Sequence, residues 1–155
     1  MIFYVLIVLL VLCLYQDVRS RSIHWVLFPL LLSASILLNF EQLSPLIIGM
    51  NLIFLVTLML GLTLYISLKN RQWTNITAGY FSWGDILFLV AVLPLFDFPS
   101  FILFFTVGTM ITLVIHLIVL LFRKQNGVPY AGYMAFLGII YLVFQDQLYQ
   151  FTRIL

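Results

Sequence analysis

Two aspartates, Asp17 and Asp85, are the residues of this sequence best suited to carry out chemistry. Ionisable groups at a membrane are costly to hold there, and by default they indicate a functional site with a partner. Two carboxylates in close contact resist double ionisation, so one keeps a proton near neutral pH while the other stays anionic. The anionic group can take a proton from water, and the protonated one can polarise a carbonyl. This is aspartic-peptidase chemistry, for which we expect no cofactor and no metal ion.

Each aspartate also has a purely structural interpretation. Asp17 can be a solvated residue that pairs with Arg19 or Arg21 at the end of a helix. Asp85 can be a favourable anion in the first turn of a helix, where the helix dipole stabilises negative charge. The two residues lie 68 positions apart, so only the elements that carry them can bring them together.

The composition indicates that those elements are membrane helices. Of 155 residues, 65% are apolar and 8% are charged, with a mean hydropathy of +1.21. A soluble domain carries about 25% charged residues, so this chain has too few to cover a surface in water. Spans of about 20 residues cross a bilayer, and six of them would use nearly the whole chain. We therefore predict an all-α, polytopic membrane helical bundle that forms a single domain over residues 1–155.

Six apolar segments lie between polar breaks, and they run Ile2–Gln16, Ile23–Leu38, Pro45–Leu68, Trp83–Phe96, Ser100–Phe122 and Val128–Phe144. Asp17 closes the first segment and Asp85 opens the fourth. Proline interrupts helical hydrogen bonding, so we expect a break at Pro29 and a short helix before Pro94.

The charged residues separate between alternate connections. Six of the seven basic residues fall in the connections after the first, third and fifth segments: Arg19, Arg21, Lys69, Arg71, Arg123 and Lys124. The other connections contain Glu41 and Asp97 and no basic residue. Basic connections face the cytoplasm, which places both termini on the non-cytoplasmic side. By this topology Asp17 and Asp85 both lie at the cytoplasmic edge of the membrane.

Three stretches resemble the motifs of one enzyme family. In Asp17-Val-Arg-Ser-Arg-Ser-Ile23 an aspartate is followed by basic residues and then by isoleucine. Ser82-Trp83-Gly84-Asp85 is similar to a Gly-x-Gly-Asp motif, and Val128-Pro129-Tyr130-Ala131-Gly132 to a proline-containing entry to the last helix. Together they resemble the type IV prepilin peptidases and archaeal preflagellin peptidases, which are intramembrane aspartic peptidases of the GxGD type.

The resemblance implies a function and a set of site residues. Asp17 and Asp85 would be the catalytic pair, and Gly84 the small residue that lets the chain turn closely beside them. The other residues expected near the site are Ser82, Arg19, Ile23 and Pro129. The implied substrate is the leader peptide of a pilin-like precursor, cleaved at the cytoplasmic face of a prokaryotic cytoplasmic (inner) membrane during type IV pilus assembly or protein secretion. The chain lacks the four-cysteine region of bifunctional members, so it resembles the short, peptidase-only form.

Departures from the family pattern keep other functions open. Ser82 stands where the family usually has glycine, and Leu87 where a lysine often follows the second aspartate. A catalytically inactive homologue that acts as a membrane scaffold is therefore one alternative. Another is a small transporter or channel subunit that uses Asp17 and Asp85 to bind protons or cations. The expected partners are the lipid bilayer and a precursor protein, with no nucleic acid, and the sequence makes no prediction of oligomeric state.

Overall fold

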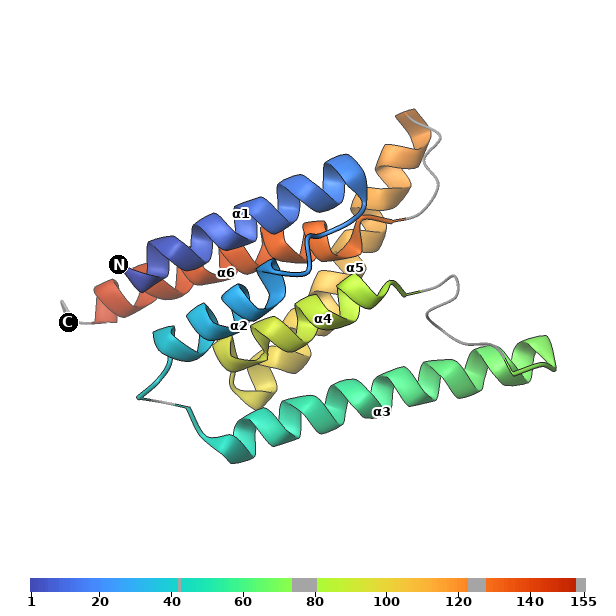
Figure 1. The fold of residues 1–155 in the computed structure, drawn as a ribbon, viewed down its shortest axis with the longest axis horizontal. Helices are drawn as coiled ribbons and strands as arrows, with labels where there is room; N and C mark the ends of the chain where they lie inside the picture. Colours follow the sequence, from blue (N-terminus) through green and yellow to red (C-terminus); the bar gives the residue numbers. More distant parts are fainter. Residues whose placement is uncertain (42, 74–80, 123–127, 153–155) are drawn as a thin grey trace.

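The computed structural model describes residues 1–41, 43–73, 81–122 and 128–152. These residues form six α-helices and one short 3-10 helix, with no β-strand among them. In chain order the elements are α1 (Ile2–Ser20), α2 (Leu27–Leu38), α3 (Pro45–Asn70), α4 (Trp83–Val92), η2 (Leu93–Leu95), α5 (Phe98–Phe122) and α6 (Tyr130–Thr152), as Figure 1 shows. The prediction of an all-α chain with about six helices is confirmed.

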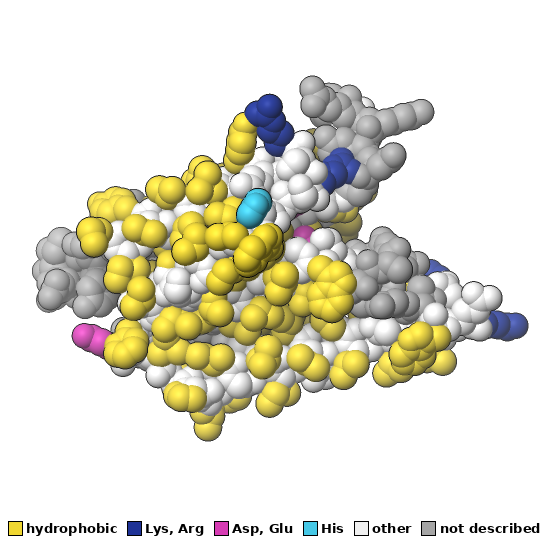
Figure 2. All heavy atoms as spheres, in the orientation of Figure 1, with side chains coloured by type: hydrophobic (Ala, Val, Ile, Leu, Met, Phe, Trp, Pro, Cys, Tyr) yellow, Lys and Arg dark blue, Asp and Glu magenta, His cyan; other side chains and the backbone are white. Residues whose placement is uncertain are grey.

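Three of these helices, α1, α3 and α5, are long and apolar enough to cross a membrane. The apolar parts of α2, α4 with η2, and α6 are shorter, each below 18 residues within the described part of the chain. Figure 2 shows hydrophobic side chains over most of the described surface in view, away from the end with the basic residues, as expected for a membrane protein.

The observed helix boundaries correct two expectations. The first helix does not stop before Asp17 but continues to Ser20, so Asp17 lies within α1. Nor does Pro29 break a helix, because α2 begins only two residues earlier, at Leu27. In a first turn, the N–H that proline lacks would have no helical partner in any case. The short helix expected before Pro94 is present, since α4 ends at Val92 and η2 follows it.

The core lies between four helices. α1 and α6 run antiparallel along much of their length, and α2 packs against both α1 and α4 (Figure 1). All four contribute fully buried side chains: Leu6 and Leu10 of α1, Leu31 of α2, Phe88 and Leu89 of α4, and Met134 of α6. Phe101 of α5 and Leu55 of α3 complete the same core. α4 also packs on α6, so the beginning of α4 and the end of α1 both adjoin the beginning of α6.

α3 lies at the edge of the bundle and is mostly exposed. Its first half makes the attachment, where the Asn51 amide donates to the carbonyl oxygen of Phe96 at 3.0 Å. The ring of Phe54 packs edge-on against three rings at the start of α5: Phe98, Phe101 and Phe105. The second half of α3 diverges from the other helices (Figure 1).

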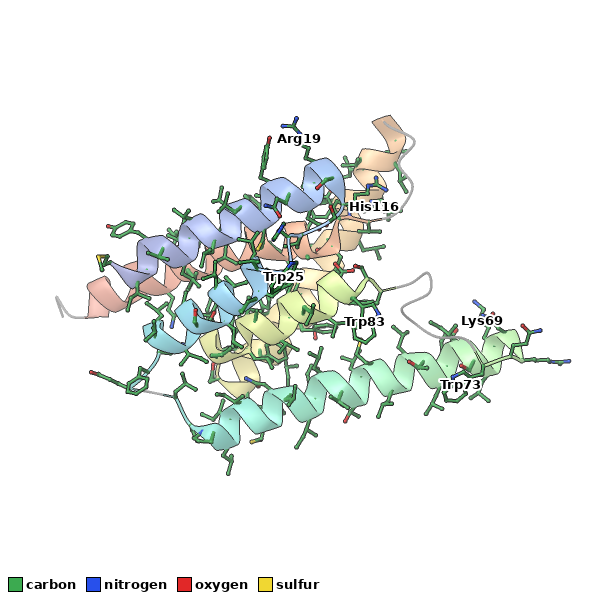
Figure 3. The ribbon with its side chains drawn as sticks, viewed as in Figure 1. Arg19, Trp25, Lys69, Trp73, Trp83 and His116 are labelled. Carbon is green, nitrogen blue, oxygen red and sulfur yellow. The ribbon has the colours of Figure 1, made fainter. Side chains whose placement is uncertain are left out.

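The charged residues separate between the two ends of the bundle. The ends of α1 and α3 carry Arg19 and Lys69, and they lie at the same end as the beginnings of α4 and α6 (Figures 1 and 3). The beginning of α1 and the end of α6 lie at the opposite end. Arg123 and Lys124, predicted to be on the basic side, lie outside the described residues.

Candidate active site

Asp17 lies in the last turn of α1, and only 7% of its surface is exposed. The helix ends at Ser20, because Arg21 adopts a left-handed conformation with φ of 54°. The Arg21 N–H donates to the Asp17 carbonyl oxygen at 2.9 Å. The end of a helix is the negative pole of its dipole, so it disfavours a carboxylate. A buried acid at this position therefore requires donors from another element.

The backbone of α6 supplies such a donor. The N–H of Gly132 donates to Asp17 Oδ2 at 2.6 Å. The first N–H groups of a helix have no partner within the helix and carry its positive pole, so the beginning of α6 stabilises the carboxylate that α1 itself disfavours. The approach is close: a Cβ at Gly132 would lie 3.1 Å from both Cβ and Oδ2 of Asp17.

Asp85 lies in the first turn of α4 and is 8% exposed. Its Oδ2 accepts the N–H of Ser82 at 3.0 Å, while the Ser82 hydroxyl accepts the N–H of Gly84 at 3.0 Å. This is the reciprocal cap that begins many helices. Asp85 does more than cap α4, however, because its Oδ1 accepts the N–H of Ala131 at 3.0 Å, across the interface with α6.

The two aspartates are thus bound to neighbouring residues of one turn. Ala131 holds Asp85 and Gly132 holds Asp17, through bonds of 3.0 and 2.6 Å. Since consecutive residues lie about 3.8 Å apart, the bonded carboxylate oxygens are separated by less than about 10 Å. The two groups are close enough for their charges to interact. The structure therefore brings together the two acids that the sequence places 68 positions apart.

Aromatic and hydroxyl side chains surround the beginning of α6. The ring of Tyr130 packs against Phe81, with ring centroids 5.0 Å apart. The Tyr130 hydroxyl and the Thr109 hydroxyl of α5 form a hydrogen bond of 2.9 Å. Tyr130 is buried and precedes the two amides directly, so these contacts fix the turn that holds both carboxylates.

The other residues predicted near the site differ in their placement. Pro129 is buried directly before α6, and its carbonyl accepts the N–H of Tyr133 at 3.1 Å. Ile23 is partly buried and packs against the core. Arg19 is exposed and points outward from the bundle (Figure 3), with its guanidinium 5.6 Å from the centre of the Tyr15 ring.

The close backbone approach to an aspartate falls at a different glycine from the one predicted. A Cβ at Gly84 would meet the Ser82 hydroxyl at 3.4 Å and the Phe28 ring at 3.8 Å, which are ordinary contacts. It is Gly132 that approaches an aspartate tightly, because a Cβ there would require Asp17 to shift by a few tenths of an ångström. In the sequence Gly132 stands out only as the last residue of Val128-Pro129-Tyr130-Ala131-Gly132, and backbone donors have no side-chain signature by which Ala131 could be recognised.

The arrangement can support proton transfer between two carboxylates and a bound water. In the described part of the chain, no group of three or more histidine, cysteine or acidic residues is placed to hold a metal ion. Comparison of the chain with protein-family models, curated proteins and solved structures finds no match.

Proposed function

We propose that this protein is a membrane aspartic endopeptidase that removes the leader peptide of a pilin-like precursor at the cytoplasmic face of a prokaryotic cytoplasmic membrane. The observation that carries the proposal is the pair of buried carboxylates, Asp17 and Asp85, held side by side on two consecutive amides. Burying two acids close together is costly, because each disfavours the ionised form of the other, so their assembly favours a chemical role.

The pair provides both halves of a hydrolysis. One carboxylate accepts a proton from water as the water oxygen attacks the scissile carbonyl carbon. The other, protonated, donates to the carbonyl oxygen, which gives a neutral tetrahedral diol. When this diol collapses, the carbon–nitrogen bond breaks, one carboxyl proton passes to the leaving amine, and a hydroxyl proton of the diol returns to the other carboxylate. Water is consumed, two peptides are released, and the pair ends with the single proton it started with.

The ends of the helices support cytoplasmic cleavage. Asp17 near the end of α1 and Asp85 at the beginning of α4 lie at the end of the bundle where α1 and α3 end (Figure 1). The residues there include Arg19, Arg21 and Lys69. Basic residues beside membrane spans face the cytoplasm, and the leader of a precursor awaiting export is there too. In this topology the chain is multi-pass, and its two termini are outside.

The motifs around the aspartates support the proposed substrate class. Asp17-Val-Arg-Ser-Arg-Ser-Ile23 and Ser82-Trp83-Gly84-Asp85 resemble the active-site motifs of prepilin peptidases. The substitution at Ser82 is compatible with the site, because its hydroxyl caps α4 and its N–H still holds Asp85. Leu87, the other departure from the family pattern, lies on α4 and is 42% exposed.

The test is a cleavage assay with a pilin-like precursor encoded near this protein's gene. Membranes that contain wild type or Asp17→Asn are incubated with the precursor, and the products are identified by mass. Leader removal by wild type alone supports the proposal and gives the cleavage position. An intact precursor with both, from folded protein, contradicts it and favours a scaffold or an ion-binding subunit, which ion-flux measurements then separate.

A further inference from the structure

The helices that carry the two aspartates barely touch each other. α1 packs mainly against α6 and α2, and α4 packs mainly against α2 and α6, with minimal direct contact between α1 and α4. Direct packing of one helix on the other therefore cannot set the separation of Asp17 and Asp85. The element that both aspartates share is the beginning of α6, through Ala131 and Gly132.

We infer that the first turn of α6 is the element that assembles the aspartate pair, with Ala131 and Gly132 as positioning residues. The role in catalysis rests on the proposed peptidase function, whereas the backbone contacts can be tested without any activity. Each amide binds one carboxylate, so the spacing of the pair is set by a single peptide unit. Covalent geometry makes that spacing far stiffer than the packing of two helices.

The turn is fixed in place from three sides. Tyr130 attaches it to α5 through the Thr109 hydroxyl and to the residue before Ser82 through the ring of Phe81. On the side of α1, Gly132 lies so close to Asp17 that a Cβ would be 3.4 Å from the Leu14 carbonyl oxygen as well. Positions held by backbone and packing in this way are what a preorganised site requires.

The two carboxylates are not held equally. Asp85 accepts two backbone N–H groups, from Ser82 and Ala131, and one of these comes from its own helix. Asp17 accepts the N–H of Gly132, on another helix, because the end of α1 offers carbonyl groups and not N–H groups at this position. The orientation of Asp17 therefore depends on α6, whereas Asp85 is also held by the cap of α4.

The test is an NMR measurement on the full chain in detergent micelles, with ¹⁵N placed in glycine and alanine only. An amide proton bonded to an ionised carboxylate resonates downfield, and its resonance moves upfield when a neutral amide replaces the carboxylate. Asp17→Asn is expected to move Gly132 upfield more than Ala131, and Asp85→Asn to move Ala131 more than Gly132. Gly138, later in α6 beside Leu10, is the internal control and should not move in either variant.

The outcomes separate this inference from the proposed function. The crossed pattern supports the inference whether or not the protein cleaves a precursor. If each variant moves both resonances equally, or moves neither while Gly138 shows an intact fold, α6 does not hold the pair. If the wild-type protein cleaves the precursor but the variants show equal shifts or none, the proposed peptidase function is retained and the role of α6 is overturned.

Discussion

Replacing Gly132 by alanine tests the close approach of α1 to α6. The new Cβ would lie 3.1 Å from Cβ and Oδ2 of Asp17. Carbon atoms pack at about 3.5–4.0 Å, so the carboxylate must move by about 0.5 Å or the helices must separate by as much. Because a misplacement of about 1 Å can cost 100-fold in rate, we expect about a 10-fold fall in the cleavage rate.

Gly138→Ala is the matched control, because Gly138 lies in α6 as Gly132 does and also faces α1. A Cβ at Gly138 would meet Leu10 Cδ1 at 3.8 Å, which is an ordinary contact. Glycine-to-alanine changes at compatible positions stabilise by about 0.4–1 kcal/mol, and overpacking costs about 1–3 kcal/mol. We therefore expect Gly138→Ala to be neutral or stabilising, and Gly132→Ala to be destabilising by up to about 2 kcal/mol.

The assay is cleavage of a pilin-like precursor by the two purified variants, with thermal unfolding in the same detergent measured in parallel. The reasoning predicts slow cleavage by folded Gly132→Ala and a wild-type rate for Gly138→Ala. Equal rates for the two variants would show that the close contact at Gly132 does not control the position of Asp17. Slow cleavage by both would trace the effect to the general packing of α1 on α6.

Substitutions at three further positions test separate parts of the account. Ser82→Ala removes the hydroxyl that accepts the Gly84 N–H and should cost about 1 kcal/mol in thermal unfolding, whereas Ser82→Gly should cost only a few tenths. Tyr130→Phe removes the hydrogen bond to the Thr109 hydroxyl, so it should lower the free energy of unfolding by about 1 kcal/mol and slow cleavage. Unchanged cleavage would show that this bond does not fix the turn. Arg19→Ala should change the cleavage rate by no more than about twofold because its side chain points outward, and a large loss would place Arg19 in the site.

The sequence predicts the helices well because their cause is local. Six apolar runs between polar breaks become six helices, and proline at position 94 ends α4 where expected. The helix boundaries predicted from the sequence are less accurate, because hydropathy marks where a helix leaves an apolar environment and not where the helix ends. α1 continues past Gln16 and Asp17 to Ser20, and its end is set by the left-handed conformation of Arg21.

The convergence of the two acids was also predictable, but the means of convergence was not. Alternation of basic and acidic connections places Asp17 and Asp85 at one end of the bundle, which the structure shows as well. It does not predict that α6 joins them, because the groups that do so are backbone N–H groups of Ala131 and Gly132. Arg19 was expected near the site from its motif, yet the helical periodicity of α1 turns it away from Asp17.

The central claim is that Asp17 and Asp85 act as one catalytic pair, and the most direct measurement is the cleavage rate of three variants. Asp17→Asn, Asp85→Asn and the double variant are purified, shown to be folded, and assayed against the same precursor as wild type. Residues that act as a unit are strongly non-additive, so each single substitution should reduce cleavage to the same background as the double. A single variant that cleaves well above the double, or two losses that multiply, would contradict the claim.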